Sequence, residues 1–185
     1  MNLITVSGPP SSGKTALIIK TIESLKIRKL KVGVVKFDCL YTDDDKLYEK
    51  AGVPVKKGLS GSLCPDHYFV SNIEEVVQWG RKEDLDVLIT ESAGLCNRCS
   101  PYIQNIKAVC VIDNLSGINT PKKIGPMLKT ADIVVITKGD IVSQAEREVF
   151  ASRVNSVNPN AVVMHVNGLT GQGAYEFSTI MYKEN

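Results

Sequence analysis

The sequence predicts an α/β fold of three layers, α/β/α, in which helices cover both faces of a mostly parallel central sheet. Short apolar runs rich in β-branched residues recur at wide intervals, and most of them are apolar on both alternating faces. Helical patterns separate several of these runs. The length of 185 residues suits one domain, and no repeat, low-complexity tract or linker divides it. We therefore expect residues 1–185 to form a single domain.

Six apolar runs are the predicted strands, because nearly continuous hydrophobicity is typical of strands that helices cover on both faces. The runs cover residues 3–6, 32–35, 87–89, 109–112, 133–136 and 161–164. Apolar side chains at helical spacing predict helices over residues 15–26, 73–79, 121–129 and 143–157. The last helix has Ser143 as its expected N-cap, with Glu146 at the capping-box position.

The stretch 37–68 is the least regular part of the chain. Gly and Pro residues interrupt it repeatedly, and it is too long for an ordinary connection between two elements. Because long loops of this kind are usually functional, we expect it to contribute to a site.

The composition is ordinary for a globular protein, with 43% hydrophobic and 23% charged residues, which excludes a disordered or collagen-like chain. The net charge of +2 and the aromatic content of 6% do not indicate a nucleic-acid or membrane partner. No stretch approaches the roughly 18 apolar residues of a membrane helix, and residues 3–6 are too short for a signal-peptide core. We therefore expect a cytoplasmic protein whose thiols stay reduced.

A phosphate-binding loop follows the first predicted strand and opens the first predicted helix. It reads Gly8-Pro9-Pro10-Ser11-Ser12-Gly13-Lys14-Thr15, a complete G-x-x-x-x-G-K-T pattern in the context that the motif requires. Its glycines allow the backbone to wrap a phosphate group, whose oxygens then accept from the loop amides. Lys14 is expected to neutralise the β- and γ-phosphates, and the Thr15 hydroxyl is expected to ligate Mg²⁺.

Two further segments favour GTP over ATP. Thr137-Lys138-Gly139-Asp140 stands where GTPases carry N-K-x-D, whose aspartate accepts from guanine and whose lysine stem covers the base. A later glycine-rich loop contains Asn167 and Gly168 after the last predicted strand, where GTPases place a second loop against the base. Each segment alone is also compatible with a charged or glycine-rich turn, so the preference for GTP depends on their agreement.

Two carboxylates, Asp38 and Glu91, end the second and third predicted strands. The carboxyl ends of parallel strands face the ligand crevice of such sheets. We therefore expect Asp38 and Glu91 to support Mg²⁺ or to position an attacking water, with Lys14 as the third catalytic residue. The alternatives are a solvated turn residue for Asp38 and a loop-capping carboxylate for Glu91.

Four side chains in two loops have the spacing of a metal site. Cys64 and His67 form a Cys-x-x-His pair, and Cys96 and Cys99 form a Cys-x-x-Cys pair. Together they would offer three sulfurs and one nitrogen, a donor set that suits Zn²⁺ or Ni²⁺. A redox pair and incidental loop thiols are the alternatives.

Three further residues of these types fall outside the predicted metal set. Cys110 lies within an apolar run and is expected to be a buried core residue. His165 ends a predicted strand, where a structural role is the simpler expectation. Cys39 adjoins Asp38, and its role is left open.

The combination of these motifs resembles the nickel-maturation GTPases of the HypB and UreG type, with CobW-type metallochaperones as wider relatives. The resemblance extends from Leu3 to about Gly173, and Cys64-Pro65 and Glu91-Ser92-Ala93-Gly94 are its most specific segments. It implies a SIMIBI-class GTPase that dimerises with nucleotide and passes a metal ion to a client apoenzyme. The Cys-Pro-His motif of the family maps to Cys64 and His67, with Asp66 inserted before the histidine.

The sequence thus predicts a GTP-hydrolysing metallochaperone that uses GTP, Mg²⁺ and either Zn²⁺ or Ni²⁺, and the two cysteines after Gly94 also leave an iron–sulfur cluster open. Its expected partners are a second copy of the chain and a client metalloenzyme or another maturation protein. A P-loop small-molecule kinase, an ATP-dependent switch and a non-catalytic sensor of nucleotide and metal are the rival functions. A kinase is disfavoured because no segment rich in arginine resembles a lid.

Overall fold

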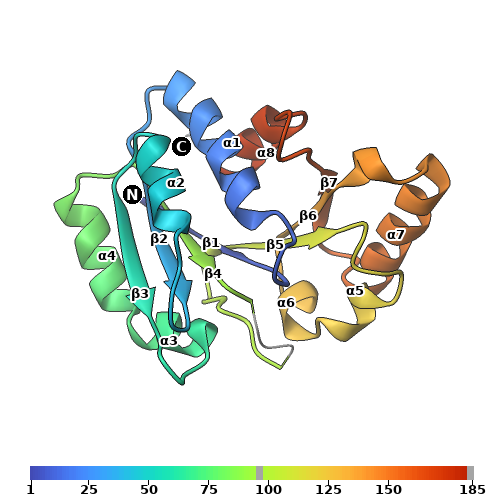
Figure 1. The fold of residues 1–185 in the computed structure, drawn as a ribbon, viewed down its shortest axis with the longest axis horizontal. Helices are drawn as coiled ribbons and strands as arrows, with labels where there is room; N and C mark the ends of the chain where they lie inside the picture. Colours follow the sequence, from blue (N-terminus) through green and yellow to red (C-terminus); the bar gives the residue numbers. More distant parts are fainter. Residues whose placement is uncertain (95–97, 183–185) are drawn as a thin grey trace.

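The computed structural model describes residues 1–94 and 98–182 and confirms the three-layer α/β/α architecture (Figure 1). Seven strands form one sheet in the order β3-β2-β4-β1-β5-β6-β7, and every neighbouring pair is parallel. The strands are β1 (Asn2–Ser7), β2 (Val32–Asp38), β3 (Val55–Leu59), β4 (Val87–Ser92), β5 (Lys107–Asp113), β6 (Ile133–Thr137) and β7 (Val162–His165).

Helices cover both faces of this sheet. The helices are α1 (Lys14–Ile27), α2 (Asp44–Lys50), α3 (Pro65–Ser71), α4 (Ile73–Lys82), α5 (Thr120–Lys123), α6 (Pro126–Lys129), α7 (Gln144–Val157) and α8 (Ala174–Met181), with a 3₁₀ turn at Gly139–Ile141. Helices α1, α2 and α8 pack on one face, where their apolar side chains meet those of β1, β2, β4, β5 and β6. The other helices pack on the opposite face through two separate apolar clusters.

The sequence predictions and the structure differ mainly in the stretch 37–68. Instead of a long irregular loop, this stretch contains helix α2, strand β3 and most of helix α3. Strand β3 has an edge position in the sheet and only partly buried or exposed residues, so its sequence lacks the continuous apolar run of a central strand. The prediction of one irregular connection was therefore wrong.

The predicted helix bounds are accurate for α7 but not for residues 121–129. Ser143 caps α7, and the reciprocal capping box with Glu146 is confirmed. The single helix predicted over 121–129 is divided into α5 and α6 at Gly125, whose φ of 53° lies outside the helical region. Helix α8 was not predicted.

Side chains at the carboxyl end of β4 point alternately to the two faces of the sheet, and this alternation positions the candidate site. Glu91 points to the face covered by α1 and α2, while the next residue, Ser92, points to the face covered by α3. One strand end therefore reaches both layers of helices.

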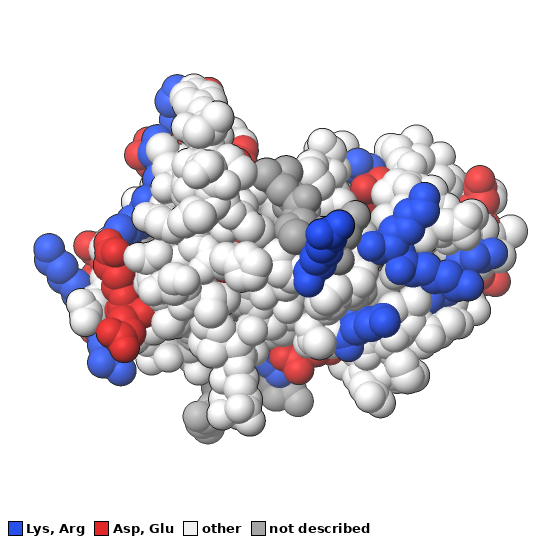
Figure 2. Space-filling model, turned by 90° about the horizontal axis from the view of Figure 1, so that it is seen from below, with Lys and Arg blue, Asp and Glu red and all other residues white. Residues whose placement is uncertain are grey.

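The view of the molecule from below shows Lys and Arg side chains gathered mainly on the half that holds α5–α7 (Figure 2). The short helices α5 and α6 contribute the exposed residues Lys122, Lys123 and Lys129 to the basic surface of this half. A positive surface of this kind favours the approach of anionic ligands. Among the described helices, none has both the length and the apolar character of a membrane span.

Candidate nucleotide and metal site

The phosphate-binding loop connects the end of β1 to the start of α1, as the motif predicts. Gly13 precedes α1 with a φ of 91°, and Gly8 also has a positive φ. A Cβ atom on Gly8 would lie 2.0 Å from the Val111 carbonyl oxygen, so a larger residue does not fit. The loop thus presents its backbone and the amino end of α1 to the crevice, which is the arrangement that binds a polyphosphate.

Lys14 is held across the loop, with its Nζ donating to the carbonyl oxygens of Gly8 at 2.9 Å and Pro9 at 2.8 Å. Its side chain is buried, and this burial lowers the pKa of Lys14 from 10.5 to about 8, against the opposing attraction of Glu91. The lysine predicted to bind phosphate is therefore buried at the site.

Thr15 lies beside two carboxylates. Its hydroxyl donates to Glu91 Oε1 at 2.9 Å and is 3.3 Å from Asp44 Oδ2. A hydroxyl and two carboxylate oxygens are the hard donors that Mg²⁺ prefers, so this group fits the ion that the motif implies. Asp44 was not among the predicted Mg²⁺ ligands.

Glu91 is almost completely buried and is fixed by three partners. Besides Thr15, it accepts from the hydroxyl of Tyr48 on α2 and pairs with Lys36 Nζ at 2.9 Å. Burial, followed by the nearby charge of Glu91, raises the pKa of Tyr48, so this phenol remains a donor. Glu91 is thus a fixed acceptor of the network and not a solvated loop carboxylate.

Asp38 lies at the end of β2 and lines the same cavity, which has a volume of about 500 Å³. Its Oδ1 accepts from the backbone N–H of Cys39 at 2.8 Å, a contact typical of a turn residue. The hydroxyl of Thr15 therefore contacts Asp44 and Glu91, while Asp38 contacts its own turn. Asp38 remains a lining residue of the nucleotide cavity.

The segment predicted to recognise guanine packs against the phosphate-binding loop. Thr137 Oγ1 donates to the carbonyl oxygen of Ser12 at 2.6 Å, and Lys138 Nζ donates to that of Ser11 at 2.7 Å. Asp140 follows on the 3₁₀ turn, where it is exposed. The segment thus lies at the carboxyl end of β6, beside the site where a nucleotide would bind.

The second predicted base loop is also adjacent to α1. A Cβ atom on Gly168 would lie 3.0 Å from the Ala16 Cβ atom, immediately after Thr15 in the chain. Asn167 Oδ1 accepts from the backbone N–H groups of Leu169 and Thr170, so this side chain shapes its own loop. The structure therefore brings both predicted base segments, from sequence positions far apart, next to the phosphate-binding loop and the start of α1.

Three of the four predicted metal ligands converge. The ligand atoms of Cys64, His67 and Cys99 all lie within 4.8 Å of one another, and the two sulfurs are 3.5 Å apart. Cys64 and Cys99 are partly exposed and His67 is exposed. Two sulfurs and one imidazole nitrogen fit a thiophilic ion such as Zn²⁺ or Ni²⁺. The fourth predicted ligand, Cys96, lies outside the described residues.

Asp66 connects this cluster to the sheet. Its carboxylate is completely buried at the start of α3, where it accepts from Ser92 Oγ and from Cys99 Sγ, the latter at 3.5 Å. Burial raises the pKa of Asp66, although the hydrogen bonds from Ser92 and Cys99 oppose this effect. The residue inserted into the Cys-Pro-His pattern is thus a partner of one metal-ligand candidate.

The three residues left outside the metal set are also located. Cys110 is completely buried in β5, in agreement with the core prediction, and burial raises the pKa of its thiol to about 12. His165 ends β7 as an exposed residue, and partial desolvation of its ring, followed by the charge of Arg147, lowers its pKa. Among the described residues, neither these two nor Cys39 joins the Cys64–His67–Cys99 cluster.

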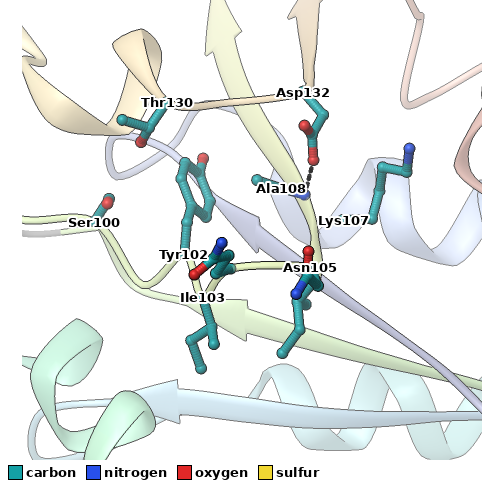
Figure 3. Close-up of a pocket in the computed structure, with 10 residues that line it drawn as sticks. Ser100, Tyr102, Ile103, Asn105, Lys107, Ala108, Thr130 and Asp132 are labelled. Atoms are coloured by element: carbon teal, nitrogen blue, oxygen red, sulfur yellow. Dashed lines mark hydrogen bonds between the residues drawn. The ribbon is translucent and has the colours of Figure 1, made fainter.

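A second cavity of about 550 Å³ lies at the amino ends of the strands, opposite the end that carries the phosphate-binding loop (Figure 3). It is lined by residues between Ser100 and Ala108 and by Thr130 and Asp132, at the amino ends of β5 and β6. Figure 3 shows the Asp132 carboxylate accepting from the backbone N–H of Ala108, at 2.8 Å. None of the described residues that line it belongs to the predicted nucleotide or metal sets.

Comparison with known proteins agrees with this geometry. Residues 2–165 match the model of the CobW/HypB/UreG nucleotide-binding domain family. The chain belongs to this family. As a CobW/HypB/UreG protein, it is a nucleotide-binding P-loop NTPase, a class whose general activity is nucleotide hydrolysis.

Two relatives in sequence extend over nearly the whole chain. An uncharacterised protein of Methanocaldococcus jannaschii is 56% identical over 178 residues, which cover 96% of this chain and 76% of that protein. The urease accessory protein UreG of Edwardsiella ictaluri is 28% identical, with 98% and 93% of the two chains covered. A urease accessory protein is thus similar to this chain along almost its full length.

Two solved structures share the fold. The hydrogenase maturation factor HypB of Archaeoglobus fulgidus has a TM-score of 0.78 at 22% identity, with 98% of this chain and 88% of that chain covered. HypB of Helicobacter pylori, solved in complex with nickel, has a TM-score of 0.79 at 20% identity, with 98% and 85% covered. These similarities confirm the predicted fold.

Proposed function

We propose that this protein is a GTP-hydrolysing metallochaperone, in which nucleotide state controls the binding and release of a thiophilic metal ion for metalloenzyme maturation. The observation that carries the proposal is the end of β4. Glu91 contacts the Thr15 hydroxyl of the phosphate-binding loop, while the adjacent Ser92 contacts Asp66, which in turn contacts Cys99. One strand end thus links the two candidate sites.

The nucleotide half of the proposal assigns roles to residues around the phosphate-binding loop. The loop amides and Lys14 would bind the phosphates, and Thr15 with Glu91 and Asp44 would hold Mg²⁺, which supplies charge neutralisation at the β- and γ-phosphates. Lys138 and Asp140 would contact guanine. Glu91 and Asp38 are the acceptors available to orient a water molecule in the cavity.

The metal half of the proposal uses Cys64, His67 and Cys99, with Cys96 as a further candidate. The three candidates among the described residues are partly or fully exposed, so a client protein or a second copy of the chain can reach an ion held there. Ligands that another protein can reach suit an ion that must be released.

A structural link between the two halves is provided by Gly94. A Cβ atom on Gly94 would lie 1.8 Å from the Gly8 carbonyl oxygen, so the chain after β4 runs directly against the phosphate-binding loop. A γ-phosphate that shifts Gly94 would therefore act on the same connection that leads to Cys99, five residues later. Because coupling between two sites is reciprocal, the metal would change GTP affinity by the same factor.

The test uses protein purified without oxygen. GTP and ATP affinities are measured by competition, phosphate release is followed with and without Mg²⁺, and Ni²⁺ and Zn²⁺ are titrated with and without a non-hydrolysable GTP analogue. We expect preferential GTP binding, slow hydrolysis and a metal affinity that depends on the analogue. Identical metal affinity and oligomeric state with and without the analogue would contradict the switch.

The same experiment separates the rival functions. ATP-dependent phosphorylation of an added acceptor would favour a small-molecule kinase. Nucleotide and metal binding without hydrolysis, even with a client protein present, would favour a sensor. If the protein prefers ATP and its metal affinity still depends on the bound nucleotide, ATP would take the place of GTP in the proposal and the metallochaperone mechanism would be retained.

A further inference from the structure

Lys36 is a buried cation in the nucleotide cavity that the sequence did not single out. It lies on β2 directly beside Glu91, as its Cα partner in the parallel ladder, and its side chain is only 5% exposed. Its Nζ is 2.9 Å from Glu91 Oε1 and 2.6 Å from Asp44 Oδ2. A second lysine thus enters the cavity in addition to Lys14.

Lys36 and Thr15 share the same two acceptor atoms. The Thr15 hydroxyl is 2.9 Å from Glu91 Oε1 and 3.3 Å from Asp44 Oδ2, the two oxygens that Lys36 contacts. A divalent ion ligated by the Thr15 hydroxyl would lie next to these oxygens. The ammonium group of Lys36 therefore has the contacts that such an ion would otherwise make.

We propose that Lys36 is a built-in counter-ion that stands in for Mg²⁺ in the nucleotide-free protein, so that a divalent ion binds only together with a nucleotide. The buried Glu91 carboxylate and the partly exposed Asp44 carboxylate would be costly to hold together without a cation, and they would also attract free divalent ions. Lys36 reduces both effects by placing one positive charge against both Glu91 and Asp44. If Mg²⁺ bound together with a nucleotide, phosphate oxygens would be further ligands and would compensate for the loss of the Lys36 contacts. This inference rests on the Mg²⁺ site of the proposed function.

A structural role for the ion pair is the competing explanation. A buried Lys–Glu pair between neighbouring strands stabilises the sheet only if its geometry is good, and its removal destabilises the fold in either case. Stability alone therefore does not distinguish the two roles. Divalent-ion affinity without nucleotide does, because only a stand-in cation competes with the ion.

The experiment measures Mn²⁺ binding from the loss of the free-ion electron paramagnetic resonance signal, first without nucleotide and then with a non-hydrolysable GTP analogue. The variants are Lys36→Met, which keeps much of the side-chain volume, and Lys36→Arg, which keeps the charge. Lys56→Gln is the matched control, because Lys56 lies on β3 and pairs with Glu75 outside the cavity. Thermal melting verifies that each variant is folded.

We expect Lys36→Met to bind Mn²⁺ without nucleotide at least about tenfold more tightly than the unmodified protein, since the positive charge that contacts both carboxylates has been removed. Lys36→Arg and Lys56→Gln should retain weak binding. Adding Thr15→Val to Lys36→Met should abolish the gain, which places the ion at Thr15. Unchanged Mn²⁺ affinity in a folded Lys36→Met variant would overturn the proposal.

Failure of the proposed function gives a different pattern. If the unmodified protein binds the GTP analogue with Mn²⁺ but shows no effect on Ni²⁺ or Zn²⁺, the metallochaperone mechanism fails and the role of Lys36 stands. If neither Mn²⁺ nor the analogue binds to any variant, the nucleotide site itself is wrong, and the Lys36 proposal is overturned with it.

Discussion

The two sides of strand β4 differ in how completely their polar groups are enclosed. On the side of α1 and α2, Glu91, Lys36 and Lys14 are buried and satisfied by one another and by the backbone. On the side of α3, Cys64 and Cys99 are partly exposed and His67 is exposed. The nucleotide side is therefore preorganised, whereas the sulfur side is open to solvent and to another protein.

This difference matches what the two ligands require. A phosphate-binding loop gains affinity from donors fixed in advance, because little reorganisation is needed when the anion arrives. A transferred metal ion needs ligands that a second molecule reaches, and buried ligands would hinder exchange. Asp66 is the exception on the sulfur side, since it is completely buried and joins Cys99 to Ser92.

The largest expected effect comes from removing the cation of the nucleotide side. Lys14→Ala should weaken GTP affinity by at least about 100-fold, because a charge-assisted contact to phosphate is lost in a buried site. Metal affinity without nucleotide should change little, since Lys14 lies on the other side of the strand. Calorimetric titration of both ligands measures the two effects.

The matched control for this change is Lys20→Ala, which alters an exposed lysine of the same helix that pairs with Glu23. It should leave GTP affinity within about a factor of two, since exposed ion pairs contribute little. Equal loss of GTP affinity in the two variants would show that Lys14 has no special role in binding phosphate.

A smaller effect is expected from the sulfur side. Cys64→Ala or Cys99→Ala should reduce Zn²⁺ or Ni²⁺ affinity by about 10- to 100-fold, because one ligand of an open site is lost. Cys39→Ala is the control, since this partly exposed cysteine lies outside the cluster. A competition assay with a chromogenic chelator gives the affinities, and a loss in the Cys39 variant equal to the others would contradict the proposed ligand set.

The smallest effect concerns protons. Burial lowers the pKa of Lys14 to about 8, and a bound polyphosphate favours the charged lysine and raises this pKa. At pH 8, GTP binding should therefore take up about half a proton, and at pH 6.5 almost none. Above pH 8, affinity should fall by up to about tenfold for each pH unit.

Titration calorimetry in buffers of different ionisation enthalpy measures this proton uptake. The Lys14→Arg variant is the control, because the guanidinium remains charged across this pH range. Proton uptake of the same size in Lys14→Arg would assign the titration to another group.

Local sequence patterns were sufficient to predict the fold and the phosphate-binding loop. The central strands are continuous apolar runs. The glycines and Lys14 of the loop belong to one contiguous sequence motif, so they are recognised without knowledge of distant residues. Strand β3 was missed because an edge strand need not be apolar on both faces. The division of α5 from α6 was missed because a glycine with positive φ interrupts the pattern at Gly125.

The candidate site depends more on contacts between distant residues. The spacing of Cys64, His67 and Cys99 predicted a cluster, and the structure brings all three together. By contrast, the roles of Lys36 and Asp44 in the site could not be predicted from the sequence. Their contacts depend on the pairing of β2 with β4 and on the position of α2. A lysine in a β-strand has no local pattern that marks it as a cavity residue.

The measurement that tests the account most directly is metal affinity as a function of nucleotide state in the unmodified protein and in Ser92→Ala. The Ser92 side chain donates to Asp66, a residue that is not itself among the candidate ligands of the nucleotide or the metal. In the unmodified protein, a non-hydrolysable GTP analogue should change Ni²⁺ or Zn²⁺ affinity by about 5- to 150-fold, the usual range of coupling between sites. In Ser92→Ala, both ligands should still bind, but this ratio should fall, because the path through Asp66 is lost while the contact of Gly94 with Gly8 remains. A ratio of one in the unmodified protein would contradict the account.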